Sequence, residues 1–86
     1  MEKFNLSFKK SAEKELRRVP NPPLKAILKR IEALMLNPRP HDASMLKGGE
    51  RNWRIRQGDY RIIYEVRDEA KEIVIIKIGH RREVYD

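Results

Sequence analysis

The stretch Trp53–Tyr64, WRIRQGDYRIIY, predicts a β-hairpin, and it decides the fold of this 86-residue chain. Its two arms are rich in β-branched and aromatic residues, which favour strands. Gly58-Asp59 lies between the arms as a two-residue loop, and a glycine in the first position of such a loop suits a type II′ turn. The loop length sets the register of the two strands, which places Arg56 opposite Arg61.

Side chains alternate across a strand, so the hairpin has an apolar face and a basic face. The apolar face carries Trp53, Ile55, Ile62 and Tyr64. The basic face carries Arg54, Arg56 and Arg61. Two arginines opposite each other destabilise a sheet, and a local rule broken without local benefit often marks a functional site. Guanidinium groups hold phosphate as rigid two-pronged donors, which predicts an anion site. The alternative is a solvated face whose charges meet nearby carboxylates, such as that of Glu65.

Length and charge narrow the class of protein. A chain of 86 residues predicts one domain, spanning residues 1–86, with one modest core. The net charge of +7 indicates an acidic partner, of which nucleic acid is the commonest. Residues 1–46 hold ten basic and five acidic residues, so most of the excess lies in the first half of the chain.

Several kinds of site are not expected. The chain has no cysteine, which excludes disulfides and thiolate–metal sites. Its two histidines, His41 and His80, are far apart and lack ligand-spaced partners, so neither a metal nor another cofactor is expected. No apolar run is as long as a membrane span, and the start of the chain lacks the layout of a signal peptide. We therefore expect a soluble cytoplasmic protein that does not bind membranes.

Two helices are predicted before the hairpin. The first covers Lys9–Val19 and is ended by Pro20. The second begins at Asn21-Pro22, with Asn21 as the N-cap, and runs about four turns. Its apolar residues recur at intervals of three and four residues and should face the core: Leu24, Ile27, Leu28, Ile31, Leu34 and Met35. Few residues join the helices, so they should form an antiparallel hairpin.

Strands are predicted on both sides of these helices. Lys3–Phe8 alternates and predicts a short first strand, with Phe4, Leu6 and Phe8 on one face. Ile73–Ile78 is apolar on both faces, which is typical of an inner strand. The expected fold is a small α+β domain of order β-α-α-β-β-β, with a helical hairpin packed on one face of an antiparallel sheet.

Two segments resemble a known family. RIRQGDYRIIYEV, over residues 54–66, and IGHRREVY, over residues 78–85, resemble the RelE toxins of bacterial and archaeal toxin–antitoxin pairs. The resemblance extends over nearly the full length and implies a RelE-like fold. It implies a ribosome-dependent mRNA endonuclease that cuts codons in the A site of the small ribosomal subunit. The implied partners are a cognate antitoxin, the ribosome and mRNA, with operator DNA reached only through the antitoxin complex.

The resemblance also implies site residues. The family's basic residues fall on Arg54, Arg56, Arg61 and Arg81, and its C-terminal tyrosine falls on Tyr85. In the family reaction the ribose 2′-hydroxyl attacks the adjacent phosphate, leaving a 2′,3′-cyclic phosphate and a free 5′-hydroxyl. That reaction needs stabilisation of the phosphoryl charge, a proton acceptor and a proton donor. We expect Arg61 and Arg81 to clamp the phosphate, and Tyr85 to stack on a base or transfer a proton.

The proton-transfer residues stay open. The best-known RelE toxins have lysines where this chain has Arg54 and Arg56, and an arginine effectively cannot lose its proton. His80 is a candidate because histidine is the usual residue for proton transfer near neutral pH, and the alternative is a solvated residue at a strand end. Glu50 and Glu83 are further alternatives.

The remaining basic residues predict contacts with RNA phosphates. Two stripes have helical spacing, and the tail adds one arginine: Lys10, Lys14 and Arg17; Lys25 and Lys29; and Arg82. A charged stripe can also be merely the solvated face of a helix. Two other functions stay open, namely a non-catalytic ParE-like toxin that inhibits DNA gyrase and a plain nucleic-acid-binding module.

Overall fold

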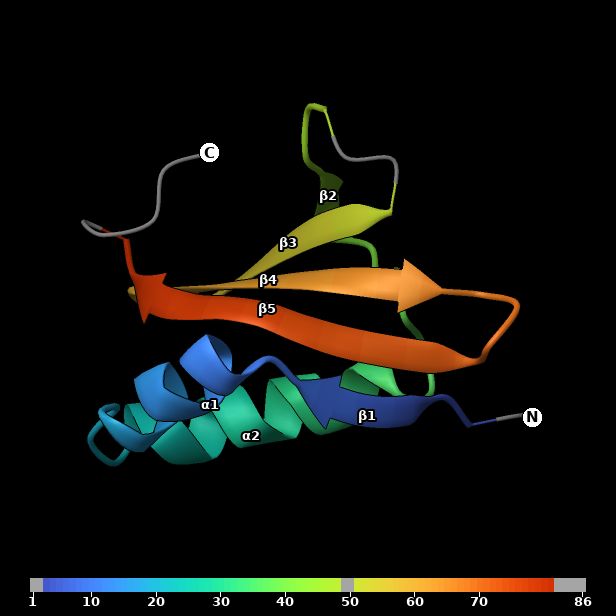
Figure 1. Cartoon of the computed structure of the whole chain (residues 1–86). Helices are drawn as coiled ribbons and strands as arrows, with labels where there is room; N and C mark the ends of the chain where they lie inside the picture. The colour runs from blue at the N-terminus through green and yellow to red at the C-terminus, as the bar shows by residue number, and fades with distance from the viewer. Residues whose placement is uncertain (1–2, 49–50, 82–86) are drawn as a thin grey trace.

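A computed structural model describes residues 3–48 and 51–81 of the chain. Its elements are β1 (Asn5–Phe8), α1 (Lys10–Arg17), α2 (Pro23–Leu34), β2 (Ser44–Met45), β3 (Asn52–Gln57), β4 (Tyr60–Arg67) and β5 (Glu72–His80). The strands form one sheet in the order β1-β5-β4-β3-β2. Both helices lie on the same face of this sheet, and within residues 3–48 and 51–81 no helix covers its other face (Figure 1).

The predicted α+β architecture is confirmed, with two corrections to the sheet. First, β1 pairs with β5 in the parallel sense, so the sheet is mixed and not antiparallel. Hairpin rules fix the direction only of strands joined by short turns, and both helices and the hairpin intervene between β1 and β5. Second, Ser44–Met45 pairs with Arg54 and Trp53 of β3, which adds a fifth strand to the four in the predicted order.

The hairpin is as predicted from its loop. Arg56 pairs with Arg61, and the two strands continue in that register to the pair of Asn52 with Glu65. Gly58 has a φ of 60°, whereas Asp59 has no positive φ, which is the pattern of a type II′ turn. The prediction that the last strand is an inner one is also confirmed, because β5 lies between β1 and β4.

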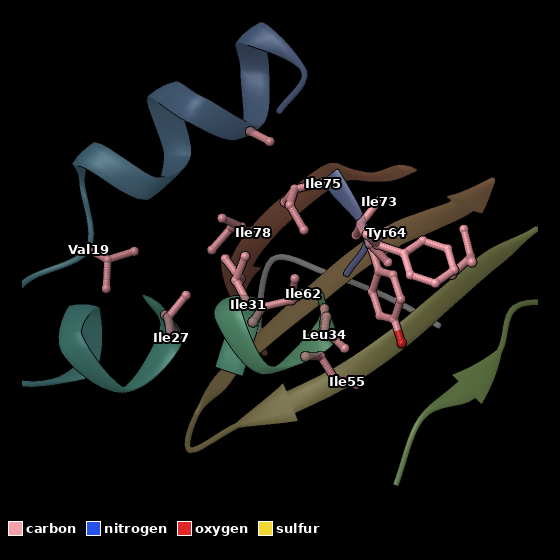
Figure 2. Close-up of a cluster of buried hydrophobic side chains, with 13 residues drawn as sticks. Val19, Ile27, Ile31, Leu34, Ile55, Ile62, Tyr64, Ile73, Ile75 and Ile78 are labelled. Carbon is pink, nitrogen blue, oxygen red and sulfur yellow. The ribbon is translucent and has the colours of Figure 1, made fainter. Parts of the chain in front are cut away.

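The core lies between the helices and the sheet (Figure 2). Ile55, Ile62 and Tyr64 of the hairpin are fully buried, and Ile27 and Ile31 of α2 pack against the same cluster. Phe4 is buried, and Leu6 and Phe8 pack partly buried on the core, as predicted for the first strand. One prediction for α2 is wrong, since the side chain of Leu28 is 44% exposed. Adjacent helical residues differ by about 100° in direction, and α2 buries only the narrow stripe that faces the sheet.

The starts of both helices differ from prediction. The first helix spans Lys10–Arg17 and is shorter than the expected Lys9–Val19. The second helix begins at Pro23, and Pro22 occupies the N-cap position in place of Asn21. Proline suits the start of a helix, because its missing N–H would have no acceptor within the first turn and its φ is already helical.

Candidate nucleic-acid interface

The basic residues of the hairpin lie on the sheet face that the helices leave uncovered. Arg56 and Arg61 lie directly opposite each other on β3 and β4. Arg54 is on the same face, two residues before Arg56. Arg54 and Arg61 are partly buried, and Arg56 is exposed. Burial, and then repulsion from Arg56 and Arg61, lowers the pKa of the Arg54 guanidinium below its ordinary value. The charges of Arg56 and Arg61 therefore act on that of Arg54, and we call these three residues the arginine cluster.

The end of β5 lies beside this cluster. Gly79 pairs with Arg61, and His80 pairs with Tyr60. The next residue, Arg81, donates its backbone N–H to the carbonyl of Asp59 at 2.7 Å. The Arg81 Nε also lies 3.8 Å from the Asp59 Oδ1. These contacts bring Arg81 to the same end of the sheet as Arg56 and Arg61, a placement that could not be predicted from the sequence alone.

The side chain of His80 points to the other side of the sheet. Its ring makes an edge-to-face contact with Tyr60, with centroids 5.6 Å apart and planes at 78°. Tyr60 packs against the core under the helices, whereas Arg61 is on the open face. The structure therefore separates the His80 imidazole from the three arginines, although their backbones are close.

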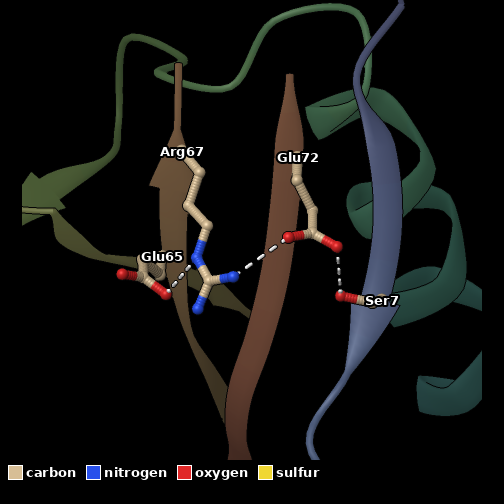
Figure 3. Close-up of polar contacts among 4 residues, drawn as sticks. All are labelled: Ser7, Glu65, Arg67 and Glu72. Atoms are coloured by element: carbon tan, nitrogen blue, oxygen red, sulfur yellow. Dashed lines mark hydrogen bonds and ion pairs between the residues drawn. The ribbon is translucent and has the colours of Figure 1, made fainter. Parts of the chain in front are cut away.

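The far end of the open face is neutralised. Arg67 Nε donates to Glu65 Oε1 at 3.0 Å, and its Nη1 donates to Glu72 Oε1 at 3.2 Å. The hydroxyl of Ser7 donates to the other oxygen of Glu72 at 3.2 Å, so the network crosses β4, β5 and β1 (Figure 3). Glu65, the predicted alternative partner for the arginine cluster, is engaged by Arg67. The open face thus has one half in which opposite charges are paired and a cationic half that carries the arginine cluster.

The predicted helical stripes lie in the helix layer, away from the arginine cluster. Lys10 and Lys14 are exposed on α1, and so is Arg17, which donates to Glu13 at 2.6 Å. Lys25 and Lys29 are exposed on α2. The remaining candidates, Arg82 and Tyr85 together with Glu50 and Glu83, lie outside the described residues.

Residues 3–48 and 51–81 contain neither a cluster of metal-ligating side chains nor a membrane-spanning helix. No group of three or more His, Cys, Asp or Glu side chains in these ranges could hold a metal ion. No helix in the described part of the chain is long and apolar enough to cross a membrane. Sequence reasoning missed Asp59 as a residue of this site. Its contact with Arg81 depends on the register of β4 with β5, which no motif in the sequence indicates.

Comparisons with known proteins agree with this architecture. Residues 6–85 match the sequence model of a family described as "ParE toxin of type II toxin-antitoxin system, parDE". A curated protein of Methanocaldococcus jannaschii named "Putative toxin RelE1" is 36% identical, over 96% of each chain. The archaeal RelE–RelB complex of Pyrococcus horikoshii matches with a TM-score of 0.82 and 29% identity, over 95% of this chain and 99% of that one. The isolated RelE toxin of E. coli matches with a TM-score of 0.81 and 25% identity, over 90% of this chain and 83% of that one.

Proposed function

The chain belongs to the RelE/ParE family of toxins from type II toxin–antitoxin systems, and we propose that it is a ribosome-dependent mRNA endonuclease. The observation that carries this proposal is the cationic half of the open sheet face. The charges of Arg56 and Arg61 act there on Arg54, and Arg81 adds a fourth guanidinium at the same end. Like charges on neighbouring strands are unfavourable to each other, and RNA phosphates that bind between the guanidinium groups would offset that repulsion.

The proposed chemistry is an attack of the ribose 2′-hydroxyl on the adjacent phosphate. Arg61 and Arg81 clamp the phosphate and stabilise the negative charge that develops on its oxygens. Arg54 and Arg56 hold the flanking phosphates, since a guanidinium cannot accept the proton of the 2′-hydroxyl. Tyr85 remains the proposed group for stacking or proton transfer.

The proposal includes three kinds of partner. An antitoxin covers the cationic face; the relatives from Pyrococcus horikoshii and Methanococcus jannaschii were solved as complexes of RelE with RelB. The small ribosomal subunit receives the toxin through the exposed stripe of Lys10, Lys14 and Arg17, with Lys25, Lys29 and Arg82 as further RNA contacts. The substrate is mRNA in the A site, which puts the action in the cytoplasm.

A ParE-like inhibitor of DNA gyrase is the second candidate, because the matching family is described by the name of the ParE toxin. The two functions are separated by brief expression of the chain in cells, followed by mapping of mRNA 5′ ends. An endonuclease that acts in the A site yields new 5′-hydroxyl ends within translated frames, in register with codons. Ends that ignore the reading frame, or a block of gyrase supercoiling by the purified protein, would overturn the endonuclease proposal.

A further inference from the structure

A cleft opens on the helix side of the sheet, beside the end of β5. It has a volume of about 290 Å³, and its walls include Glu15 of α1, Arg18 just after α1, Tyr60 and His80. None of the roles proposed above uses this cleft. Its lining combines a carboxylate, a guanidinium and an aromatic pair, which are the groups that bind single nucleobases.

The cleft is reachable from the cationic face across a single strand. β1 stops pairing with β5 at Ile75, so the stretch of β5 beyond that residue has no strand on this side. In Figure 1, α1 lies below this part of β5, next to β1. Gly79 lines the cleft and also pairs with Arg61, so the backbone of one residue separates the two sites. Adjacent strands are about 4.8 Å apart within the sheet, so an RNA strand that links the two sites passes over one strand width, at β5.

Glu15 is held in place by the strand it faces. Its Oε1 accepts the backbone N–H of Ile78 at 2.9 Å, and its Oε2 accepts from the Lys77 ammonium at 3.3 Å. A carboxylate has about four acceptor positions, so one position on each oxygen is left for a ligand. The charges of Lys77 and Arg18 offset that of Glu15, which lowers its repulsion of RNA phosphates.

We propose that this cleft binds a splayed-out guanine, with Glu15 reading its Watson–Crick edge. A carboxylate offers only acceptors, and guanine is the RNA base with two adjacent N–H donors on that edge. The aromatic rings of Tyr60 and His80 give apolar contact with the base, and Arg18 meets its phosphate. This inference rests on the proposed function only in taking RNA as the partner.

The test uses the protein alone, so it depends neither on the ribosome nor on cleavage. The ¹⁵N-labelled chain is titrated with four trinucleotides, UGU, UAU, UCU and UUU, while the backbone amide of Ile78 is followed by NMR. That amide reports on the cleft because it donates to Glu15. UGU should shift the Ile78 signal and bind roughly 5- to 150-fold more tightly than the other three, the discrimination expected of a good two-pronged base contact.

Two variants make the test specific. Glu15→Gln should bring the four affinities together, because an amide offers one donor and one acceptor. Glu13→Gln is the matched control: it makes the same change two residues earlier on α1, where Glu13 is exposed and pairs with Arg17. It should keep the preference for UGU. If Glu15→Gln fails to fold, Glu15→Asp retains the acid but withdraws it by one methylene, and it should lose most of the preference. An Ile78 amide that no trinucleotide shifts, or a preference that Glu15→Gln preserves, overturns the proposal.

Experiments with ribosomes distinguish whether the guanine belongs to mRNA or to ribosomal RNA. If it belongs to mRNA, Glu15→Gln redistributes the cut sites among codons. If it belongs to ribosomal RNA, the variant lowers ribosome affinity and leaves the distribution unchanged. If Glu15→Gln weakens only antitoxin binding, the cleft belongs to a protein partner and the guanine proposal is wrong. Failure of the parental chain to cleave translated mRNA contradicts the endonuclease proposal alone, because the trinucleotide result stands without it.

Discussion

Arg61 is the residue on which the proposed chemistry depends most. It pairs with Arg56 on one side and with Gly79 on the other, so its guanidinium is next to a second arginine and next to a residue without a side chain. A fixed donor aimed at developing charge contributes about 10²- to 10³-fold in rate. Arg61→Ala should therefore slow mRNA cleavage by about that factor at equal ribosome occupancy. Arg61→Lys should not restore the rate, because a point charge cannot make the two-pronged contact.

The hairpin contains a matched control for this variant. Arg67 is on the same strand and the same face, but its guanidinium is already engaged by Glu65 and Glu72. Arg67→Ala removes the same side chain at the neutral end of the face and should leave the cleavage rate within about twofold of the parent, since exposed ion pairs contribute little. If both variants lose the same cleavage rate, the position on the face does not matter, and the proposal that Arg61 clamps the phosphate is wrong.

Tyr64 provides a test of the core. Burial raises the pKa of Tyr64 to about 12, and the nearby Arg30 and Arg39 only partly oppose this. Between pH 10 and 12 the folded state therefore binds more protons than the unfolded state, so stability falls as the pH rises. The parent should lose roughly 1 to 2 kcal/mol of unfolding free energy by pH 11 relative to Tyr64→Phe. Urea unfolding of both proteins from pH 9 to 11 measures this difference; parallel curves would contradict it.

At neutral pH the same variant should be the less stable one. The Tyr64 hydroxyl donates to the carbonyl of Pro38 at 2.7 Å, which ties the loop after α2 to the sheet. Loss of that bond should lower the unfolding free energy by about 1 kcal/mol. The order of stability of the two proteins should thus reverse as the pH rises.

The pairing of strands that are joined by a short turn could be predicted from the sequence. The pairing of strands that are distant in the chain could not. The register of β3 with β4 followed from the two-residue loop, and the burial of Ile55 and Ile62 followed from that register. The partner and direction of β1 depend on an edge of β5 that lies more than sixty residues away in the chain. The ladder between β4 and β5 also shifts at Ile63/Tyr64, which no repeat in the sequence signals.

The same distinction between local rules and distant pairing applies to the residues of the candidate site. Arg54, Arg56 and Arg61 were predicted to share a face because a single hairpin carries all three. The placement of Arg81 depends on the ladder between β4 and β5, so it came only with the structure. The separation of the His80 ring from the arginines has the same origin.

The α1 stripe leads to a prediction about docking. Changing Lys10, Lys14 and Arg17 together to Ala should weaken ribosome binding, because their charges no longer neutralise RNA phosphates. The slope of log affinity against log salt should fall by roughly 0.7 to 0.9 for each phosphate that is left unneutralised. Arg17 should contribute least, because Glu13 already holds it at 2.6 Å. Cleavage at saturating toxin should survive, since the stripe is in the helix layer.

A triple variant outside α1 controls for the change in net charge. Lys3, Lys47 and Arg51 are also exposed, and their replacement by Ala removes three positive charges elsewhere on the molecule. This variant should keep most of the parental salt slope. If both triple variants change the slope equally, the stripe acts only through the net charge of the protein.

At the scale of the whole molecule, the charge of +7 is distributed over two layers. The open sheet face carries the arginine cluster, and the helix layer carries the exposed lysines of α1 and α2. In the proposed mechanism a partner that neutralises the toxin covers the arginine cluster, and a small acidic chain that wraps the domain reaches both layers. Expression of the chain alone should accordingly arrest growth, and co-expression of such a neighbour-encoded protein should restore it.

Binding of that antitoxin should also be visible as stability. A ligand that binds only the folded state stabilises it by about 2.7 kcal/mol at one hundred times its Kd. For a domain of this size, 1 kcal/mol corresponds to roughly 4 to 8 °C in Tm, so the toxin should melt about 10 to 20 °C higher in the complex. Because the contact is between opposite charges, the increase should shrink when the salt concentration is raised. Replacing Arg54, Arg56 and Arg61 together with Ala should reduce the increase more than the Lys3, Lys47 and Arg51 variant does. An equal increase in both variants would mean that the antitoxin does not bind the cationic face.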